Sequence, residues 1–160
     1  MKLHVLGATI LLGTLLAAMG GHVLADDDGN AEPERPSPDQ EAFIWEADDD
    51  ELEWMPCPEF MPEGCRLAVL QGDPTEENAD VFFRLAPDSK VPEHWHTSAE
   101  RMVLISGELH VDYEGQDPVV MNSGTYAYGP KGLPHTTYCA EGEECILFIA
   151  FEEAVDAHPH

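Results

Sequence analysis

Three histidines and one glutamate stand at spacings that could gather their side chains around one metal ion. They are His94, His96, Glu100 and His135. On a β-strand, residues two apart face the same side, so the first two histidines can point together, and a short turn would return the glutamate with the same parity. The third histidine opens a later strand. Imidazole nitrogens and a carboxylate oxygen suit the divalent transition metals Fe, Mn, Ni, Cu, Co and Zn, so the sequence predicts a metal site.

The segments that must hold these ligands have the pattern of short β-strands. From Arg66 onward, apolar runs alternate with turns rich in glycine, proline, asparagine and aspartate. The expected strands cover residues 67–70, 81–85, 102–105, 109–113, 119–121, 125–128, 136–138 and 145–151. Short β-rich segments with this punctuation are typical of an all-β sandwich or barrel, and no helical periodicity of useful length competes with them.

Two longer motifs contain the four candidate ligands. The first runs from Asp88 through the His-x-His pair and the glutamate to Gly107, and the second runs from Gly124 through a Pro-x-Gly turn and the third histidine to Cys139. Both motifs resemble those of the cupin superfamily, Gly-x5-His-x-His-x3–4-Glu-x6-Gly and Gly-x5-Pro-x-Gly-x2-His-x3-Asn. Asp88 replaces the first glycine and Cys139 replaces the last asparagine. Neither position is a metal ligand in the family pattern, so the departures concern turn geometry.

The resemblance covers roughly residues 64–152 and implies a double-stranded β-helix, or jelly-roll, with a metal at the mouth of the barrel. It implies that all four candidate ligands bind this metal, which leaves two positions of an octahedral ion open. The chain looks most like small secreted cupins of unassigned function. Small cupins often pair through their sheets, so a homodimer is expected.

Two classes of function agree with such a site. The first is a metal-dependent oxygenase (for instance a dioxygenase) or lyase acting on a small oxygen-rich molecule, in which the metal orients and polarises the substrate or activates dioxygen. The alternative is a non-catalytic module that binds, or senses, a metal or small ligand. The fold alone does not choose between them.

Other polar and aromatic side chains near the motifs are not expected to bind the metal. Arg101 and Glu93 have the opposite strand parity to the neighbouring ligands and should face away. Three further histidines are expected to face solvent, namely His110, His158 and His160. Tyr126 and Tyr128 share one strand face and are expected to pack in the barrel wall.

The N-terminus has the features of an export signal. Lys2 precedes an almost uninterrupted apolar run over residues 5–19, and Val23 and Ala25 stand at the −3 and −1 positions of a cleavage site. This pattern predicts a secretory signal peptide over residues 1–25 and a secreted or periplasmic protein. A membrane anchor is the alternative, but the run is shorter than the roughly twenty residues that span a bilayer. After cleavage, no membrane association is expected.

The four cysteines of an exported chain are expected to form two disulfides. Of the three pairings, the local one is favoured, because Cys57 and Cys65 flank a loop rich in proline and glycine, while Cys139 and Cys145 flank a hairpin tip. A Cys139 thiol near the metal is the alternative, since this residue follows the third histidine by four positions.

The charge of the chain limits its partners. Its 160 residues include 32 acidic and 7 basic side chains, giving a net charge of −25. So few lysines and arginines exclude a protein that binds nucleic acid through basic patches, and a small-molecule ligand or substrate is expected instead. Such acidity is also consistent with a salt-rich or marine habitat.

The remaining segments flank the motif-bearing region. We expect a flexible acidic leader over 26–41, an N-terminal arm over 42–63, a cupin domain over 64–152 and a C-terminal tail over 153–160. The apolar residues of the arm are expected on the outside of the domain, and they are Phe43, Ile44, Trp45, Leu52 and Trp54. The acidic cluster 48–51 lacks the alternating ligands and turn glycine of a calcium loop, so a solvated surface is expected there.

Overall fold

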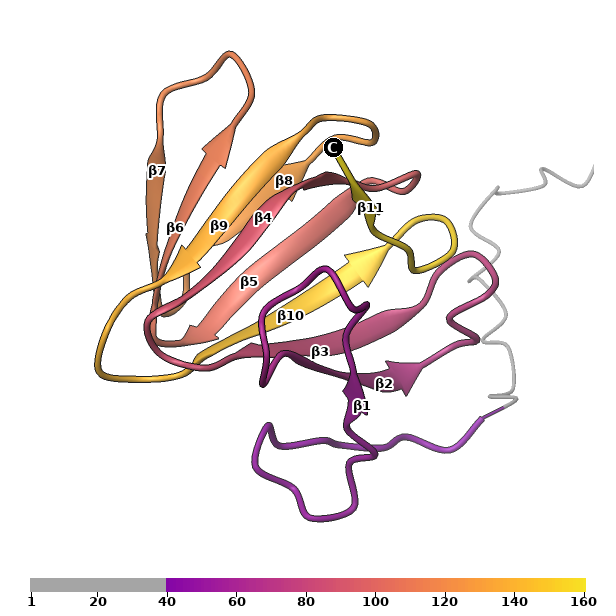
Figure 1. The fold of residues 1–160 in the computed structure, drawn as a ribbon. Coiled ribbons are helices and arrows are strands. Elements are labelled where there is room, and N and C mark those ends of the chain that lie inside the picture. The colour runs from indigo at the N-terminus through magenta and orange to yellow at the C-terminus, as the bar shows by residue number, and fades with distance from the viewer. Residues whose placement is uncertain (1–39) are drawn as a thin grey trace, which may run out of the picture. The chain divides into compact units, whose positions relative to one another are not determined.

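The structure, a computed structural model, describes residues 40–160, of which Ala42–His160 form one unit. The predicted signal peptide and nearly all of the predicted acidic leader lie outside the described residues. Residues 40–160 contain strands and no helix, and therefore no helix long and apolar enough to cross a membrane. The strands are β1 (Met55–Pro56), β2 (Arg66–Gln71), β3 (Asp80–Leu85), β4 (Ser89–Trp95), β5 (Glu100–Ser106), β6 (Glu108–Tyr113), β7 (Val119–Asn122), β8 (Tyr126–Gly129), β9 (His135–Cys139), β10 (Cys145–Phe151) and β11 (His158–Pro159) (Figure 1).

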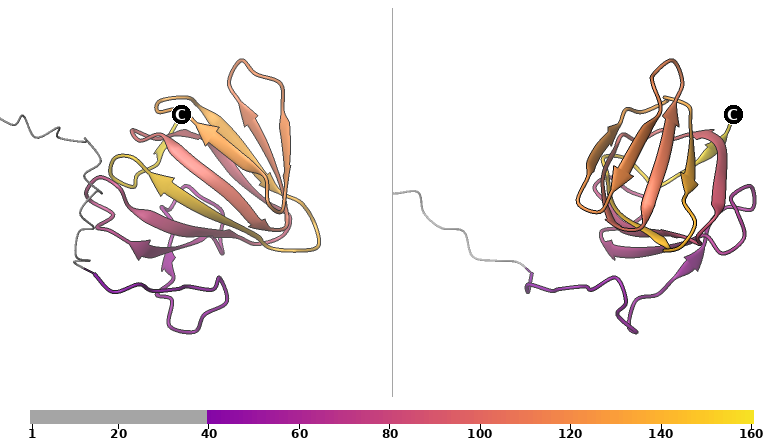
Figure 2. Two further views of the ribbon diagram at one scale, coloured as in Figure 1. Left: turned by 180° about the vertical axis from the view of Figure 1, so that it is seen from behind. Right: turned by 90° about the vertical axis from the view of Figure 1, so that its left-hand side faces the viewer.

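The strands form two antiparallel sheets. One has the order β1-β2-β3-β10-β5-β8 and the other β11-β4-β9-β6-β7. In both sheets a late strand is inserted between two earlier ones, β10 between β3 and β5 and β9 between β4 and β6, as in the two Greek keys of a jelly-roll. Figure 2 shows the strands wrapped around a shared interior. The prediction of an all-β jelly-roll is confirmed.

The interior of the barrel is filled by alternate residues of each strand. Met102 and Leu104 of β5 point inward, as do Leu147 and Ile149 of β10, and all four are buried. Because strand side chains alternate between faces, every second residue enters the core. The runs of alternating burial in β5 and β6 explain why these strands could be recognised from sequence.

The N-terminal arm covers part of the outer face of the first sheet. Leu52 is buried against Ala68 of β2 and Phe82 of β3, in a cluster separate from the barrel core. The Arg84 guanidinium lies 4.0 Å above the Trp54 ring and donates a hydrogen bond to the carbonyl of residue 47 at 2.8 Å. The part of the arm up to Trp54 therefore lies outside the barrel, as expected, except that Leu52 is buried in this second small core. The rest of the arm, from Met55 to Met61, contributes to the wall of the cavity inside the barrel.

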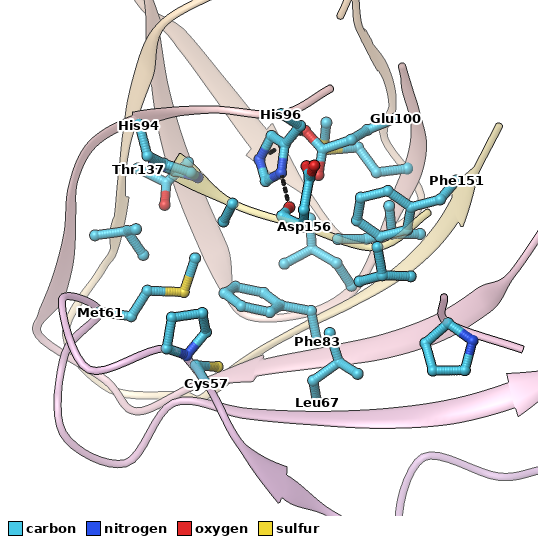
Figure 3. A pocket seen from close by; sticks show the side chains of 18 of the residues that line it. Cys57, Met61, Leu67, Phe83, His94, His96, Glu100, Thr137, Phe151 and Asp156 are labelled. Atoms are coloured by element: carbon cyan, nitrogen blue, oxygen red, sulfur yellow. Dashed lines mark hydrogen bonds and ion pairs between the residues drawn. The ribbon is translucent and has the colours of Figure 1, made fainter. Parts of the chain in front are cut away.

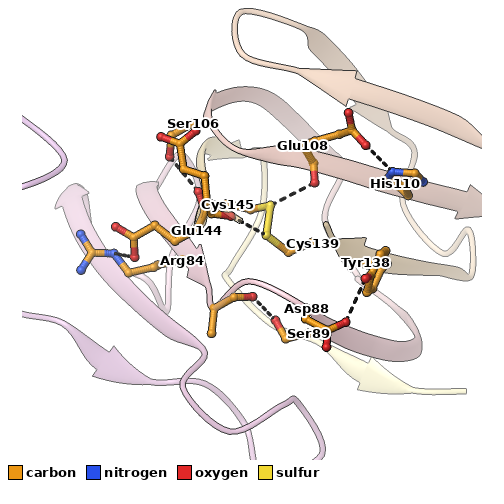
Figure 4. Close-up of a disulfide and its surroundings, with 12 residues drawn as sticks. Arg84, Asp88, Ser89, Ser106, Glu108, His110, Tyr138, Cys139, Glu144 and Cys145 are labelled. Atoms are coloured by element: carbon orange, nitrogen blue, oxygen red, sulfur yellow. Dashed lines mark hydrogen bonds and ion pairs between the residues drawn. A yellow bond between two sulfur atoms is a disulfide. The ribbon is translucent and has the colours of Figure 1, made fainter. Parts of the chain in front are cut away.

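Both local disulfides are present, with Cα atoms 5.5 Å apart in Cys57–Cys65 and 5.8 Å apart in Cys139–Cys145. Figure 4 shows the second pair beside Glu108, whose backbone carbonyl oxygen lies 3.3 Å from Cys145 Sγ. The alternative of a Cys139 thiol at the metal is therefore wrong, because this sulfur is bonded to another cysteine.

The first departure from the cupin motifs has a conformational reason. Asp88 has a φ of +57°, in the left-handed region that glycine enters freely and that aspartate tolerates better than most residues. Its carboxylate also accepts a hydrogen bond from the Tyr138 hydroxyl at 2.9 Å (Figure 4). The turn before β4 is thus retained without glycine.

One expectation about the barrel wall is wrong. Tyr126 and Tyr128 lie on β8, at the edge of the first sheet, and are 60% and 51% exposed. Alternation along the strand did place both on one face, but that face points to solvent.

Candidate metal centre

Two cross-strand rows bring three of the predicted ligands to one end of the barrel, and His96 follows directly after the end of β4. In the second sheet, the strand register places His94 opposite His135, and His135 opposite Tyr113. In the first sheet, Phe151 lies opposite Glu100, which lies opposite Gly129. Residues that are directly opposite on antiparallel strands have adjacent side chains. The pairing of strands distant in sequence therefore assembles the site.

All four sequence-predicted ligands meet at the point where these rows face each other. One ring nitrogen from each of the three histidines lies within 4.8 Å of the others. Glu100 Oε2 lies 3.3 Å from His96 Nε2 and 3.9 Å from His135 Nε2. His94, His96, His135 and Glu100 are all buried. Among residues 40–160, the three histidines are the one group of three or more histidine, cysteine or acidic side chains gathered closely enough to hold an ion, and Glu100, although it lies near His96 and His135, is not a member of that group.

The backbone orients all three imidazole rings in the same manner. Nδ1 of His94 lies 2.8 Å from the carbonyl oxygen of Pro92, and Nδ1 of His135 lies 3.1 Å from that of Leu133. Nδ1 of His96 lies 2.5 Å from a carbonyl oxygen in the C-terminal segment. A carbonyl oxygen only accepts, so each Nδ1 carries the proton and each Nε2 presents a lone pair.

Burial keeps the imidazoles neutral. It lowers the pKa of His94, lowers the pKa of His96 to about 4 and lowers that of His135 to about 3, since a charged ring would lose its hydration. Burial also raises the pKa of the Glu100 carboxyl to about 8, with a further contribution from the negative charge of Asp156. No lysine or arginine lines the cavity at this site.

These features fit a bound divalent cation. The Nε2 atom of His96 is buried without a hydrogen-bond partner, although a buried polar atom normally has one. Glu100 is a buried acid with no basic side chain to neutralise it. A cation among the three Nε2 atoms would accept the lone pair of His96 and neutralise the charge of an ionised Glu100. Imidazole and carboxylate together are a common donor set for transition metals. The residues present therefore fit the metal that the cupin motifs imply.

Gly129 leaves room for the Glu100 carboxylate. A Cβ atom at this position would lie 3.3 Å from Glu100 Oε2, 3.3 Å from Met102 Cε and 3.5 Å from the Tyr113 hydroxyl oxygen. The two contacts at 3.3 Å are tighter than ordinary van der Waals contacts, so a side chain here would displace the Glu100 carboxylate or the Met102 methyl group by a few tenths of an ångström. The glycine is thus a positioning residue of the site.

Sequence reasoning missed Tyr113. Its hydroxyl is buried without a hydrogen-bond partner, and its ring centroid lies 5.3 Å from that of His135. Burial, with the charge of Glu100, raises the pKa of Tyr113 to about 12, so the group retains its proton. The alternation of Leu109, Val111 and Tyr113 predicts its inward direction, but only the pairing with β9 places it beside a ligand.

Asp156 was also missed, because nothing in the acidic C-terminal sequence marks it. Its carbonyl is the acceptor for His96, and its carboxylate accepts from the Thr97 amide at 2.9 Å, the Thr97 hydroxyl at 2.5 Å and His158 Nε2 at 3.0 Å. The segment expected as a C-terminal tail thus packs against the site, and β11 pairs with β4.

The non-ligand residues are mostly placed as expected. Arg101 and Glu93 are exposed, the former near Glu152 and the latter bonded to His160. His110 contacts Glu108 on the surface. The side chains of His110 and His158 are both 43% exposed, as expected, and the His158 ring also stacks on Trp95 with ring centroids 4.4 Å apart.

A cavity of about 280 Å³ opens from the four predicted ligands into the barrel. Figure 3 shows His94, His96 and Glu100 at one side of this cavity and Met61, Leu67 and Phe83 at the other. The loop closed by the Cys57–Cys65 disulfide forms part of its wall. The site therefore has space for a small molecule next to the predicted metal position.

Comparisons with known proteins agree with the fold and the motifs. A family model described as the ChrR cupin-like domain matches residues 45–155. None of the curated proteins matches the sequence.

Solved structures share the fold at low sequence identity. A DMSP lyase, DddQ, from Ruegeria pomeroyi DSS-3 superposes with a TM-score of 0.59 and 17% identity, over 68% of this chain and 60% of its own length. The polyketide cyclase RemF from Streptomyces resistomycificus gives a TM-score of 0.60 and 14% identity, over 73% of this chain and 85% of its own. An RmlC-like cupin from Shewanella frigidimarina gives a TM-score of 0.57 and 20% identity, over 73% of this chain and 95% of its own length.

Proposed function

This chain belongs to the cupin superfamily, in the family of ChrR cupin-like domains, and we propose that it is an exported metalloprotein that transforms a small molecule as a metal-dependent oxygenase or lyase. The proposed ligands are His94, His96, Glu100 and His135. The observation that supports this most directly is the common orientation of the three imidazoles, each with Nδ1 held by a carbonyl and Nε2 turned toward the same place.

The chemistry divides between the metal and the chain. A bound divalent metal supplies Lewis-acid or redox chemistry at the positions that four protein ligands leave open. The backbone carbonyls fix the ring orientations before the ion arrives, and Glu100 provides the single negative charge among the ligands. Tyr113 keeps its proton beside Glu100 and could donate a hydrogen bond there. The apolar cavity excludes water from a reacting ligand.

A specific observation favours the alternative, a non-catalytic binding or sensing module. Apart from the four proposed ligands, the cavity is lined by one further ionisable side chain, Asp156, and its carboxylate is already engaged by Thr97 and His158. No second acid or base that lines the cavity is therefore free for proton transfer, which catalysis by an oxygenase or lyase often uses.

Metal analysis tests the common premise of both functions. Protein purified without a histidine tag or chelator should contain about one transition metal ion per chain, while His96→Ala and His135→Ala should lose most of it. His110→Ala is the matched control, because this histidine lies on the surface, and it should keep its metal. Unchanged metal content in both site variants would overturn the assignment.

A substrate screen then separates enzyme from binding module. Fe, Mn, Ni, Cu, Co and Zn forms are incubated with small enols, diols and carboxylates while oxygen uptake and product formation are followed. Turnover that Glu100→Ala abolishes supports the enzyme. Ligands that raise the melting temperature of the metal-loaded protein without turnover in any form support the binding module.

Export is part of the proposal, and the two disulfides support an oxidising compartment. We expect the signal peptide to be cleaved after Ala25 during export, so the mature protein should begin at Asp26. Intact mass spectrometry of protein from its own host measures this directly. Size-exclusion chromatography with light scattering tests the expected homodimer.

A further inference from the structure

The cavity beside the predicted metal has almost entirely apolar walls. Its apolar lining includes Met55, Met61, Leu67, Phe83, Leu147 and Ile149, of which Met61, Leu67 and Phe83 lie opposite the metal ligands in Figure 3. Apart from the four predicted ligands and Asp156, Thr137 is the one polar side chain among its lining residues. Burying a hydroxyl or amide without a hydrogen-bond partner is unfavourable, so these walls disfavour a ligand that carries polar groups along its whole length.

The charge of the cavity limits the ligand in a second way. No lysine or arginine lines it, and its acidic members are Glu100 and Asp156. A substrate with several anionic groups would thus find one positive centre, the metal, and would be repelled by the net charge of −25 on the chain. Phosphorylated sugars and polycarboxylates fit this environment poorly.

The size of the cavity sets an upper limit on the ligand. A protein cavity of about 150 Å³ holds one benzene molecule of six carbon atoms. By that measure the present cavity, at about 280 Å³, accommodates about eleven non-hydrogen atoms.

We propose that the substrate or ligand is a mostly hydrocarbon molecule of about this size, with one oxygen-bearing head that binds the metal and an apolar body that fills the cavity. This inference rests on the proposed metal site and narrows its ligand class. It replaces the expectation of an oxygen-rich molecule, because the oxygen atoms must be gathered at one end of the ligand. The body lies against Met61, Leu67 and Phe83.

A homologous series of metal-binding probes tests this proposal. Acetohydroxamate, butanohydroxamate, hexanohydroxamate and decanohydroxamate share one head and differ in chain length. Their dissociation constants for the zinc-loaded protein are measured by calorimetry, and metal content is checked afterwards. Each added methylene should tighten binding by about fourfold until about eleven non-hydrogen atoms fill the cavity. The six-carbon probe has nine such atoms and the ten-carbon probe has thirteen, so the longer one should bind about sixteenfold more tightly, as two methylenes provide, and not the roughly 250-fold that four would provide.

The results distinguish this inference from the proposed function. If the protein holds zinc and binds acetohydroxamate, but hexanohydroxamate binds no more tightly, the metal site stands and the apolar ligand class is wrong. If the protein holds no metal, the proposed function fails first. Equal affinity of hexanohydroxamate for metal-free protein would also contradict the inference, because the head would then have no role.

Substitution of Met61 provides an independent check. This residue lies in the loop of the Cys57–Cys65 disulfide, with its sulfur 3.9 Å from Cys65 Sγ. Met61→Asp should weaken hexanohydroxamate by about tenfold, because a carboxylate must be desolvated in the wall, and should leave acetohydroxamate within about twofold. Met61→Leu is the volume-matched control and should preserve both. Equal weakening of both probes by Met61→Asp would contradict the proposed position of the body.

Discussion

The backbone carbonyl of Asp156 accepts a hydrogen bond from Nδ1 of His96 at 2.5 Å, across 60 positions of sequence. The same residue holds Thr97, the neighbour of that histidine, through its carboxylate. The C-terminal segment therefore fixes the orientation of one proposed ligand from outside the two sequence motifs.

Replacing Asp156 by alanine should weaken metal binding without unfolding the protein. The carboxylate contacts to Thr97 and His158 would be lost, so the carbonyl would be held less firmly, and loss of such an outer contact typically costs about 10–100-fold in metal affinity. Asp156→Asn, which keeps one acceptor oxygen, should be intermediate. Competition with a chromophoric chelator measures the affinities.

Glu153→Ala is the control for this prediction. Glu153 is an exposed acid in the same segment, 3.4 Å from Lys131, so its removal changes the charge equally without touching His96. Wild-type affinity in Asp156→Ala, or an equal loss in the control, would contradict a positioning role.

The stability of the metal-free protein should depend on pH through Glu100. The pKa of its carboxyl is about 8 in the folded state and 4.5 in the reference state. Between these values the unfolded chain releases its proton while the folded one keeps it, so stability falls as pH rises from about 5 to 8. Glu100→Gln removes the ionisable group and with it this fall in stability. At pH 8 the metal-free variant should therefore melt about 4 °C or more above the metal-free wild type.

The neighbouring histidines change the stability with pH in the opposite direction. Their effect is the same in wild type and in Glu100→Gln, so it cancels when the two proteins are compared. The pKa values of these histidines are lowered on folding, so the unfolded chain gains protons below about pH 6.5 and stability falls as pH decreases. Both proteins share this effect. At pH 4.5 and below, wild type and Glu100→Gln should therefore melt together. With metal bound, the order at pH 8 should reverse, because the variant lacks the anionic ligand. Equal melting temperatures of the metal-free proteins at pH 8 would disagree with a buried neutral carboxyl.

Gly129→Ala should lower metal affinity more than it lowers stability. The added methyl would lie 3.3 Å from both Glu100 Oε2 and the terminal carbon of Met102. Methionine is flexible and can move, whereas displacement of the carboxylate by a few tenths of an ångström disturbs a metal site directly. The measurements are metal stoichiometry and the melting temperature of the metal-free form.

Met102→Leu in the Gly129→Ala background tests the cause. If the methionine contact alone were responsible, the shorter side chain would restore metal binding, and the role assigned to the glutamate contact would be wrong. We expect the loss to persist.

The two disulfides should differ in their effect on ligands. Replacing either pair by alanines removes a short covalent loop and should destabilise the protein by about 2 kcal/mol. Only Cys57–Cys65 closes a loop that lines the cavity, so its loss should also weaken hexanohydroxamate. Loss of Cys139–Cys145, the matched control, should leave that affinity unchanged. Calorimetry at a temperature where both variants are folded makes the comparison, and equal ligand affinities would count against the loop as a cavity wall.

Much of the fold could be predicted because its signals are local. Alternation of apolar residues identified strands such as Glu108–Tyr113, and turn formers marked their ends. The cysteines of each disulfide are 8 and 6 positions apart, so nearby partners were favoured. Parity along a strand also predicted correctly that His94 and His96 share a direction and that Arg101 points away.

The tertiary structure decided what lies across from these residues. Strand register brought Tyr113 beside His135 and gave Glu100 a glycine neighbour, and folding of the C-terminal segment supplied Asp156. It also made one face of β8 solvent-exposed, so that Tyr126 is on the surface. Alternation tells which residues share a face of a strand, but which face is buried, and which residue stands opposite, depend on contacts between segments far apart in the chain. For the same reason the apolar cavity, built from several strands and the arm, has no signature in any one stretch of sequence.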